Sequence, residues 1–240
     1  MKTKQEIVER AIILNALWNR CGLETEMVGG DFYDEQERER RRINVLEWLQ
    51  DKGYYDSVTA EEKRIFEQPV SKHGTKELWS KEFQCKASDA LLWALGLVPE
   101  MSDYLHFPFD DRWDLLQIGS EHTKEKLMAS CVMRSRGEME FETDLACLWH
   151  WRAMEIGSTP PNGQSWRECI LSIFGEECAP LLDEIPWSKK APGDFLVGKK
   201  TVSQFNKTEE KMFYINAYWR HYGLEWITSD AAWDEVSVDT

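Results

Sequence analysis

The segment from 144 to 154, DLACLWHWRAM, carries the side chains of this chain that are best placed for chemistry. At the angular spacing of an α-helix, Arg152 falls on the same face as the apolar residues of the segment. A guanidinium group cannot lose its charge, so on an apolar face it needs a carboxylate partner or must reach water. We therefore predict that Arg152 is buried and bonded to a carboxylate from another segment, with Glu82, Asp234 and Asp239 as candidates. The alternative is that Arg152 holds an anionic ligand.

His150 lies on the opposite face of the same predicted helix, among small and apolar residues. Asp144 is about 120° away around the helix, so the two residues cannot form an acid–base pair there. Cys147 and His150 have the i,i+3 spacing that could place both on one metal ion, but no nearby residue completes a ligand set. We expect a hydrogen-bonded core histidine, and neither a metal site nor another cofactor.

Four motifs that indicate common active sites are absent from the chain. They are the phosphate-binding G-x-x-x-x-G-K-[ST], the dinucleotide-binding G-x-G-x-x-G, the zinc-binding H-E-x-x-H and the nucleophile motif G-x-S-x-G. Their absence weighs against nucleotide binding, zinc proteolysis and α/β-hydrolase chemistry. It does not exclude an enzyme, because many active sites have no local sequence signature.

Tryptophan is unusually frequent, with 12 residues spread along the whole chain, and this spread favours a structural role over one local site. Large aromatic side chains hold helices together, and each indole N–H needs a partner. The functional alternative is an aromatic-lined pocket or a peptide groove. The candidate aromatic anchors are Trp79, Trp93, Trp149, Trp151 and Trp233.

The last eight residues, WDEVSVDT, combine one large aromatic residue with two alternating valines. Charged tails usually extend into solvent, but Trp233, Val236 and Val238 predict that this one docks on the rest of the protein. In the docked position, it could deliver the carboxylates of Asp234 and Asp239 to Arg152.

Helical periodicity predicts the elements that must position these residues, and the fold class is all-α. We expect a single helical domain over residues 1–240, with about eight helices packed around those at 76–95 and 138–156. The other predicted helices lie at about 4–21, 34–52, 121–135, 166–174, 177–185 and 206–223. Capping boxes are predicted at Thr59 and Asn206. A small β-hairpin near 194–205 is optional.

The charge and the cysteines restrict the partners and the compartment. Acidic residues outnumber basic ones by 43 to 29, which gives a formal net charge of −14. This excess repels nucleic acid and anionic lipid, so neither nucleic acid nor a membrane is expected as a partner, whereas a protein with a basic surface is. The N-terminal segment lacks a signal-peptide pattern, and six scattered cysteines without a C-x-x-C pair are typical of reduced thiols. We therefore expect a cytoplasmic protein.

Three segments together resemble a known family. They are ELWSKE and SDALLWALG within 77–96, DLACLWHWRA at 144–153, and WDEVSVDT at 233–240. In this order they resemble the bacterial family catalogued as domain of unknown function 4272, over about residues 35–240. Ser80 stands where that family usually has an arginine, so no role of the arginine is transferred to Ser80. The resemblance implies a mostly α-helical, cytoplasmic bacterial protein, and it implies no activity.

Taken together, these features favour a non-catalytic binding or interaction protein with an acidic surface. Two alternatives stay open at this point. One is a homodimeric structural or scaffold protein. The other is an enzyme whose pocket is built from Arg152, Glu82 and the carboxylates of the tail.

Overall fold

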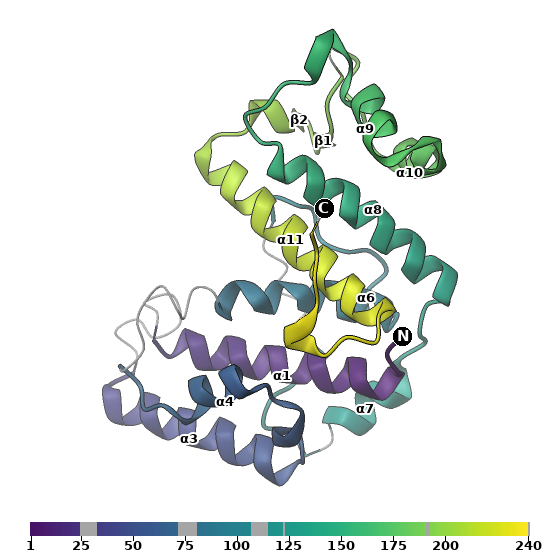
Figure 1. The fold of residues 1–240 in the computed structure, drawn as a ribbon. Helices are drawn as coiled ribbons and strands as arrows, with labels where there is room; N and C mark the ends of the chain where they lie inside the picture. The colour runs from purple at the N-terminus through teal and green to yellow at the C-terminus, as the bar shows by residue number, and fades with distance from the viewer. Residues whose placement is uncertain (25–32, 72–80, 107–114, 122, 191–192, 240) are drawn as a thin grey trace.

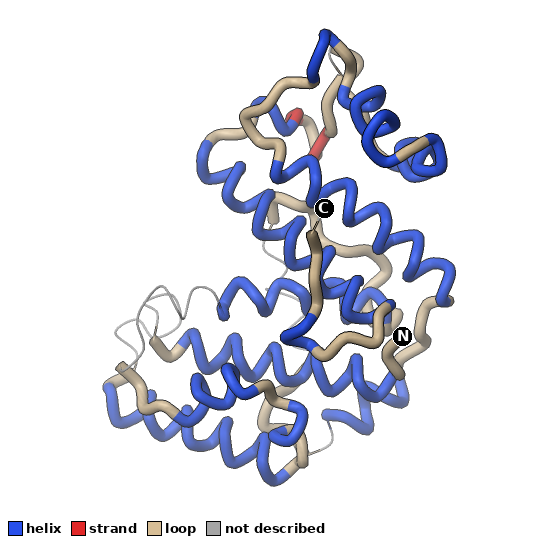
Figure 2. The backbone as a smooth tube through the Cα atoms, in the orientation of Figure 1, coloured by secondary structure: helices blue, strands red, loops and turns tan. Residues whose placement is uncertain are grey.

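The computed structural model describes residues 1–24, 33–71, 81–106, 115–121, 123–190 and 193–239, and most of them are helical (Figure 2). This confirms the predicted all-α fold with one small hairpin. The α-helices of the described residues are α1 (Lys4–Gly22), α3 (Glu35–Asp51), α4 (Ala60–Glu67), α6 (Ser88–Ala94), α7 (Thr123–Ser130), α8 (Arg136–Met154), α9 (Trp166–Phe174), α10 (Ala179–Glu184) and α11 (Lys207–Thr228).

Capping boxes begin many of these helices, including both that the sequence predicts. Thr59 accepts a hydrogen bond from the backbone N–H of Glu62 at the start of α4, and Glu62 accepts one in return from the backbone of Thr59. Asn206 and Glu209 do the same at the start of α11. Each pair satisfies two backbone N–H groups that a helix terminus leaves without partners, so these starts are encoded locally.

The predicted helix at 76–95 is not a single α-helix in the residues that the structure describes. Residues 76–80 lie outside them, and a 3₁₀ turn, η3 (Cys85–Ala87), separates the helical residues 81–84 from α6. At this turn α11 comes very close, because a Cβ atom added to Gly223 would lie 3.1 Å from the carbonyl oxygen of Ala87. Gly223 therefore allows helix packing, and the prediction that it ends the helix is wrong: α11 continues to Thr228.

The predicted hairpin is present between α10 and α11. Strand β1 (Leu196–Val197) pairs antiparallel with β2 (Lys200–Thr201), with Leu196 opposite Thr201. A further bridge joins Trp187 to Phe195. This small element lies over one end of α8 and α11, beside α9 and α10 (Figure 1).

The helices form two buried apolar clusters. The first, here called the α1 cluster, lies between α1, α3, α4, α6, α7 and the second half of α11. The second, here called the α9 cluster, lies between α9, α10, the hairpin, the last turns of α8 and the first half of α11. Figure 1 shows α8 and α11 side by side between the two groups of helices, and both helices contribute residues to both clusters. The helices of the described residues include none that is long and apolar enough to cross a membrane.

Candidate functional site

Arg152 is buried and paired with a carboxylate, as the sequence predicts, but its partner is Asp194. Only 1% of the Arg152 surface is exposed. Its Nε and Nη2 donate to the two carboxylate oxygens of Asp194 at 2.9 and 3.1 Å, and its Nη1 donates to the carbonyl oxygen of Glu155 at 3.1 Å. The ring of Trp166 lies 4.2 Å from the guanidinium carbon. All faces of the group are therefore occupied by protein.

The three predicted partners of Arg152 are wrong. Asp194 lies just before β1 and also accepts hydrogen bonds from the backbone N–H groups of Phe195 and Ser203, both at 2.8 Å. The pair therefore fixes the hairpin to α8, and it leaves Arg152 no room for an anionic ligand. The hydrogen bonds and the ring contact that Arg152 makes with the described residues involve neither Glu82 nor the tail, with which the enzyme alternative places it in one pocket.

His150 is a buried, hydrogen-bonded histidine, as predicted. Its exposed fraction is 2%, and its Nδ1 lies 3.3 Å from Nδ1 of His221 on α11. Burial lowers the pKa of His150, and burial together with the charge of His150 lowers the pKa of His221 to about 4. Both rings are therefore neutral near pH 7, with one ring donating the shared hydrogen bond and the other accepting it.

A cavity of about 360 Å³ opens beside this histidine pair, between α8, α11 and the docked tail, and we call it the α8–α11 cavity. It is lined by His150, Met154, Tyr214, Tyr218, Val236, Ser237, Val238 and Asp239. Figure 1 shows the tail running along α11 and ending near α8. Of the five candidate polar residues Arg152, Glu82, Asp234, Asp239 and His150, two therefore line one cavity, His150 and Asp239, without Arg152 and Glu82. Asp234 is exposed and does not line the cavity.

One atom of His150 lacks a partner. Nε2 is buried and makes no hydrogen bond to any of the residues that the structure describes. Leaving a buried polar atom unsatisfied costs about 1–3 kcal/mol, so a group that bonded to it would be favoured. Because Nδ1 is used by His221, Nε2 is the nitrogen that remains for a ligand.

Aromatic rings form one wall of the cavity. Tyr214, Tyr218 and Tyr222 follow one another at i,i+4 along α11, with stacked ring centroids 6.3 and 6.1 Å apart. The His150 ring meets Tyr218 edge-on at 5.2 Å. Tyr214 is 42% exposed, which leaves its ring accessible at the mouth of the cavity. The spacing predicts that these rings share one helix face, but their meeting with His150 depends on how α8 packs on α11.

The tail docks through Trp233, as the sequence predicts. This side chain is 5% exposed and lies 5.1 Å from the ring of Tyr222 and 5.2 Å from that of Trp226. The Tyr222 hydroxyl donates to the backbone carbonyl of Trp233. The guanidinium carbon of Arg10 lies 4.8 Å from the Trp233 ring. The valines and Asp239 that follow are thereby held over the cavity.

The other candidate aromatic anchors lie away from the cavity. Trp149 and Trp151 are buried in the α9 cluster, and Trp93 is buried in the α1 cluster with the Arg134 guanidinium 4.5 Å from its ring. Trp79 lies outside the described residues. The three that are described serve packing.

Acidic groups continue from the cavity along the two helices. Burial raises the pKa of Asp144, with a further contribution from Glu140, and burial and Asp144 raise the pKa of Glu225. Asp144 stands two turns before His150 on α8, and Glu225 one turn after His221 on α11. Within the described part of the chain, no salt bridge neutralises Asp144, Glu225 or Asp239. This side of the molecule therefore carries unbalanced negative charge.

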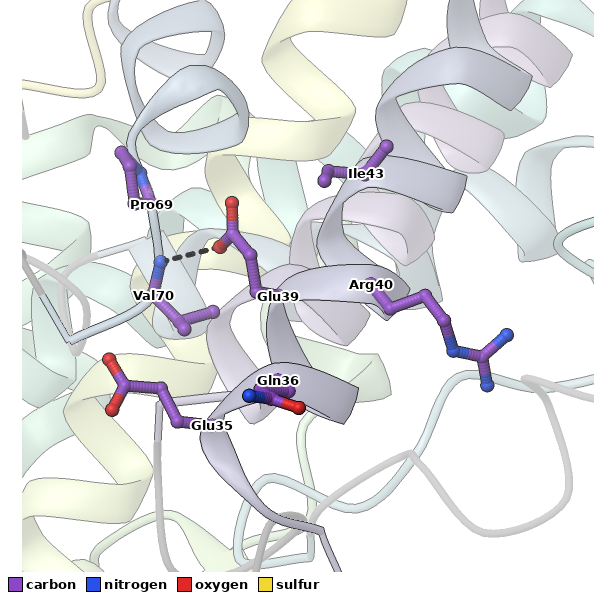
Figure 3. Close-up of a pocket in the computed structure, with 7 residues that line it drawn as sticks. All are labelled: Glu35, Gln36, Glu39, Arg40, Ile43, Pro69 and Val70. Carbon is purple, nitrogen blue, oxygen red and sulfur yellow. Dashed lines mark hydrogen bonds between the residues drawn. The ribbon is translucent and has the colours of Figure 1, made fainter.

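A larger cavity, of about 580 Å³, lies between α3 and residues 69–70 (Figure 3). Figure 3 shows Glu39 pointing from α3 to the backbone of Val70, whose N–H donates to it at 3.0 Å, while Arg40 points away. Glu39 also accepts from Arg42 at 2.6 Å. The carboxylate of Glu39, at the centre of this cavity, already accepts hydrogen bonds from the protein. We therefore consider this cavity a weaker candidate for a ligand site than the α8–α11 cavity.

A buried polar network joins η3 to α11, and the charge of Glu82 acts on its lysine, Lys86. Lys86 donates to Asn216 at 2.8 Å, and Asn216 donates to the carbonyl oxygen of Tyr104 at 2.7 Å. Burial lowers the pKa of Lys86 to about 7, against the opposing charge of Glu82. The cavity here holds only about 10 Å³, too little for more than a single water molecule. Among the described residues, no three His, Cys, Asp or Glu side chains lie together as a metal site.

The histidine pair should make stability depend on pH. Because the pKa of His221 is lowered from 6.5 to about 4 in the folded protein, the unfolded chain binds more protons between these values. The contribution of His221 to the free energy of unfolding is therefore complete above pH 6.5. It is lost as the pH falls to 4, by about 3 kcal/mol. Urea unfolding of His221→Gln should show a smaller loss of stability over this range than the wild type. The matched change at exposed His106, His106→Gln, should leave the slope unaltered; equal slopes for all three proteins would contradict the assignment.

Comparison with known proteins gives one match. The model of the family described as Domain of unknown function (DUF4272) matches residues 1–163. No curated protein and no solved structure matches the chain. The matched range begins earlier and ends earlier than the predicted 35–240, so it includes α8 with His150 but not α11 or the tail. The terminal WDEVSVDT, one of the segments that carry the resemblance, lies outside the match.

Proposed function

We propose that this chain, which belongs to the DUF4272 family, is a non-catalytic binding protein whose ligand site is the α8–α11 cavity. One observation carries the proposal: His150, whose buried Nε2 has no hydrogen-bond partner among the described residues, lines a cavity with aromatic walls. Ligand sites are commonly of this size, with apolar walls and a few polar groups that fix the orientation of the ligand.

The arrangement of the polar groups favours binding over catalysis. A serine nucleophile needs a neighbouring histidine as base, but the hydroxyl of Ser237 donates to Asp239 at 3.0 Å. His150 in turn shares its Nδ1 with His221, which orients the ring and leaves Nε2 as the nitrogen without a partner among the described residues. These contacts support a site that recognises one polar group among aromatic rings.

We further propose that the protein is cytoplasmic and that its partner has a basic surface. All six cysteines are free thiols, five of them buried, as suits a protein of the reducing cytoplasm. The formal net charge of −14 supports a partner with a basic surface. A homodimeric scaffold stays an alternative prediction.

The cavity can be tested with a library of small organic fragments, observed by NMR of the full chain. We expect some fragments to shift the His150 Hε1 signal and the ring signals of Tyr218 in a saturable manner. His150→Phe keeps an aromatic ring but removes Nε2, and it should weaken these fragments at least fivefold. The control His106→Phe, at an exposed position, should bind them as the wild type does. A library without a single fragment at these signals would refute the proposal.

A further inference from the structure

We infer that the group bound in the α8–α11 cavity is an alkylammonium, the end of a lysine side chain on a basic partner protein. This inference rests on the proposed function, since it specifies what the same cavity recognises. Three features of the cavity carry it: its aromatic faces, its charge and its unpartnered nitrogen.

The aromatic faces suit a cation that also carries apolar surface. Tyr214 and Tyr218 are stacked on one wall, with His150 edge-on to the second ring. The face of an aromatic ring carries partial negative charge, so it attracts an ammonium group at distances up to about 6 Å. The side chains of Val236 and Val238, which the tail adds to the lining, can pack against the methylene groups of the same ligand.

The charge of the surroundings excludes an anion. Among the described residues no lysine or arginine lines the cavity, whereas Asp239 does. Asp144 and Glu225 lie farther along the same two helices, without a salt bridge in the described residues. A carboxylate or phosphate ligand would meet repulsion here, and a cation would lessen the repulsion that already exists.

The nitrogen of His150 can accept the proton-bearing group. When Nδ1 of His150 donates to His221, Nε2 carries the lone pair and is an acceptor. An ammonium group has three donors, enough to bond to Nε2 and to Asp239 at once. Arginine fits less well, because it prefers both oxygens of a carboxylate and one Asp239 oxygen already accepts from Ser237.

The test uses three probes with the full chain: the Nα-acetyl N-methylamides of lysine, norleucine and arginine. NMR titration should show that the lysine compound shifts the His150 and Tyr218 signals with an affinity at least fivefold above that of the norleucine compound. The arginine compound should bind more weakly than lysine. Asp239→Asn should weaken the lysine compound about threefold to fivefold and leave norleucine unchanged. Glu235→Gln removes an exposed carboxylate of the same tail that does not line the cavity, so it is the matched control and should have no effect.

Equal affinity for lysine and norleucine, unaffected by Asp239→Asn, would overturn the inference while leaving the cavity as a binding site. Failure of these probes and of the fragment library would overturn the proposed function as well. A peptide of alternating lysine and alanine should bind more tightly than the single lysine compound, and more weakly as salt is added. If the peptide and the single lysine compound bind with the same affinity, the proposal that the lysine belongs to a partner protein is contradicted.

Discussion

Replacement of Trp233 by alanine is expected to lower the free energy of unfolding by about 3–5 kcal/mol, the cost of removing a large buried aromatic side chain. Trp233 packs against Tyr222 and Trp226 and lies over the guanidinium of Arg10, so its loss leaves a cavity bordered by rings that cannot all collapse into it. Truncation after Ala232 should lower the free energy of unfolding by at least the same amount and lower the melting temperature by several degrees.

Chemical denaturation of Trp233→Ala beside Asp234→Asn gives the measurement and its control. The adjacent aspartate is exposed, so its change should alter stability by no more than about 0.5 kcal/mol. A melting temperature that the truncation leaves unchanged would show that the tail is not docked in solution. The cavity would then lack one of its walls, so this experiment also tests a premise of the binding proposal.

Arg152→Met is the second change with a large expected effect, again about 3–5 kcal/mol of destabilisation. Removing one member of a buried ion pair leaves the other charge uncompensated, here Asp194, which is only 4% exposed. The backbone N–H groups of Phe195 and Ser203 compensate Asp194 in part, because they donate to it as well.

The α9 cluster supplies a matched control for this change. Arg167 pairs with Asp183 at 2.7 Å, but both side chains are substantially exposed. Such pairs contribute about 0–1 kcal/mol, so Arg167→Met should have a small effect in the same urea unfolding experiment. Equal effects of the two substitutions would show that Arg152 and Asp194 are not held in a water-excluded pair.

Local signals in the sequence predict much of the helical structure. The capping boxes at Thr59 and Asn206 begin helices where predicted, because a cap depends on residues three apart in the chain. Local signals do not predict the 3₁₀ turn at Cys85–Ala87 or the continuation of α11 past Gly223. Both involve the close approach of two helices distant in sequence, which a local pattern does not contain.

The candidate site, too, could be predicted only in part from the sequence. Burial of Arg152 could be predicted from an apolar helix face, and docking of the tail from Trp233. The partners could not: Asp194 lies in a segment without periodicity, and His221 is separated from His150 by 71 residues. The sequence therefore identifies side chains that require partners, and the packing of α8 on α11 decides which partners they meet.

The two apolar clusters have a consequence for cooperativity. Among the described residues, the buried members of the α9 cluster other than Tyr104 come from one continuous stretch, residues 148–217, whereas the α1 cluster takes its residues from both sides of that stretch. A segment of this kind can open as a unit while the remaining helices stay folded, giving two classes of amide hydrogen exchange. The α8–α11 cavity takes His150, Met154 and Tyr214 from this segment and its other lining residues from the rest of the chain, so opening of the segment would break the site. A bound ligand then slows exchange in the segment in proportion to its affinity, and the cavity becomes a thermodynamic link between two otherwise separable parts of the chain.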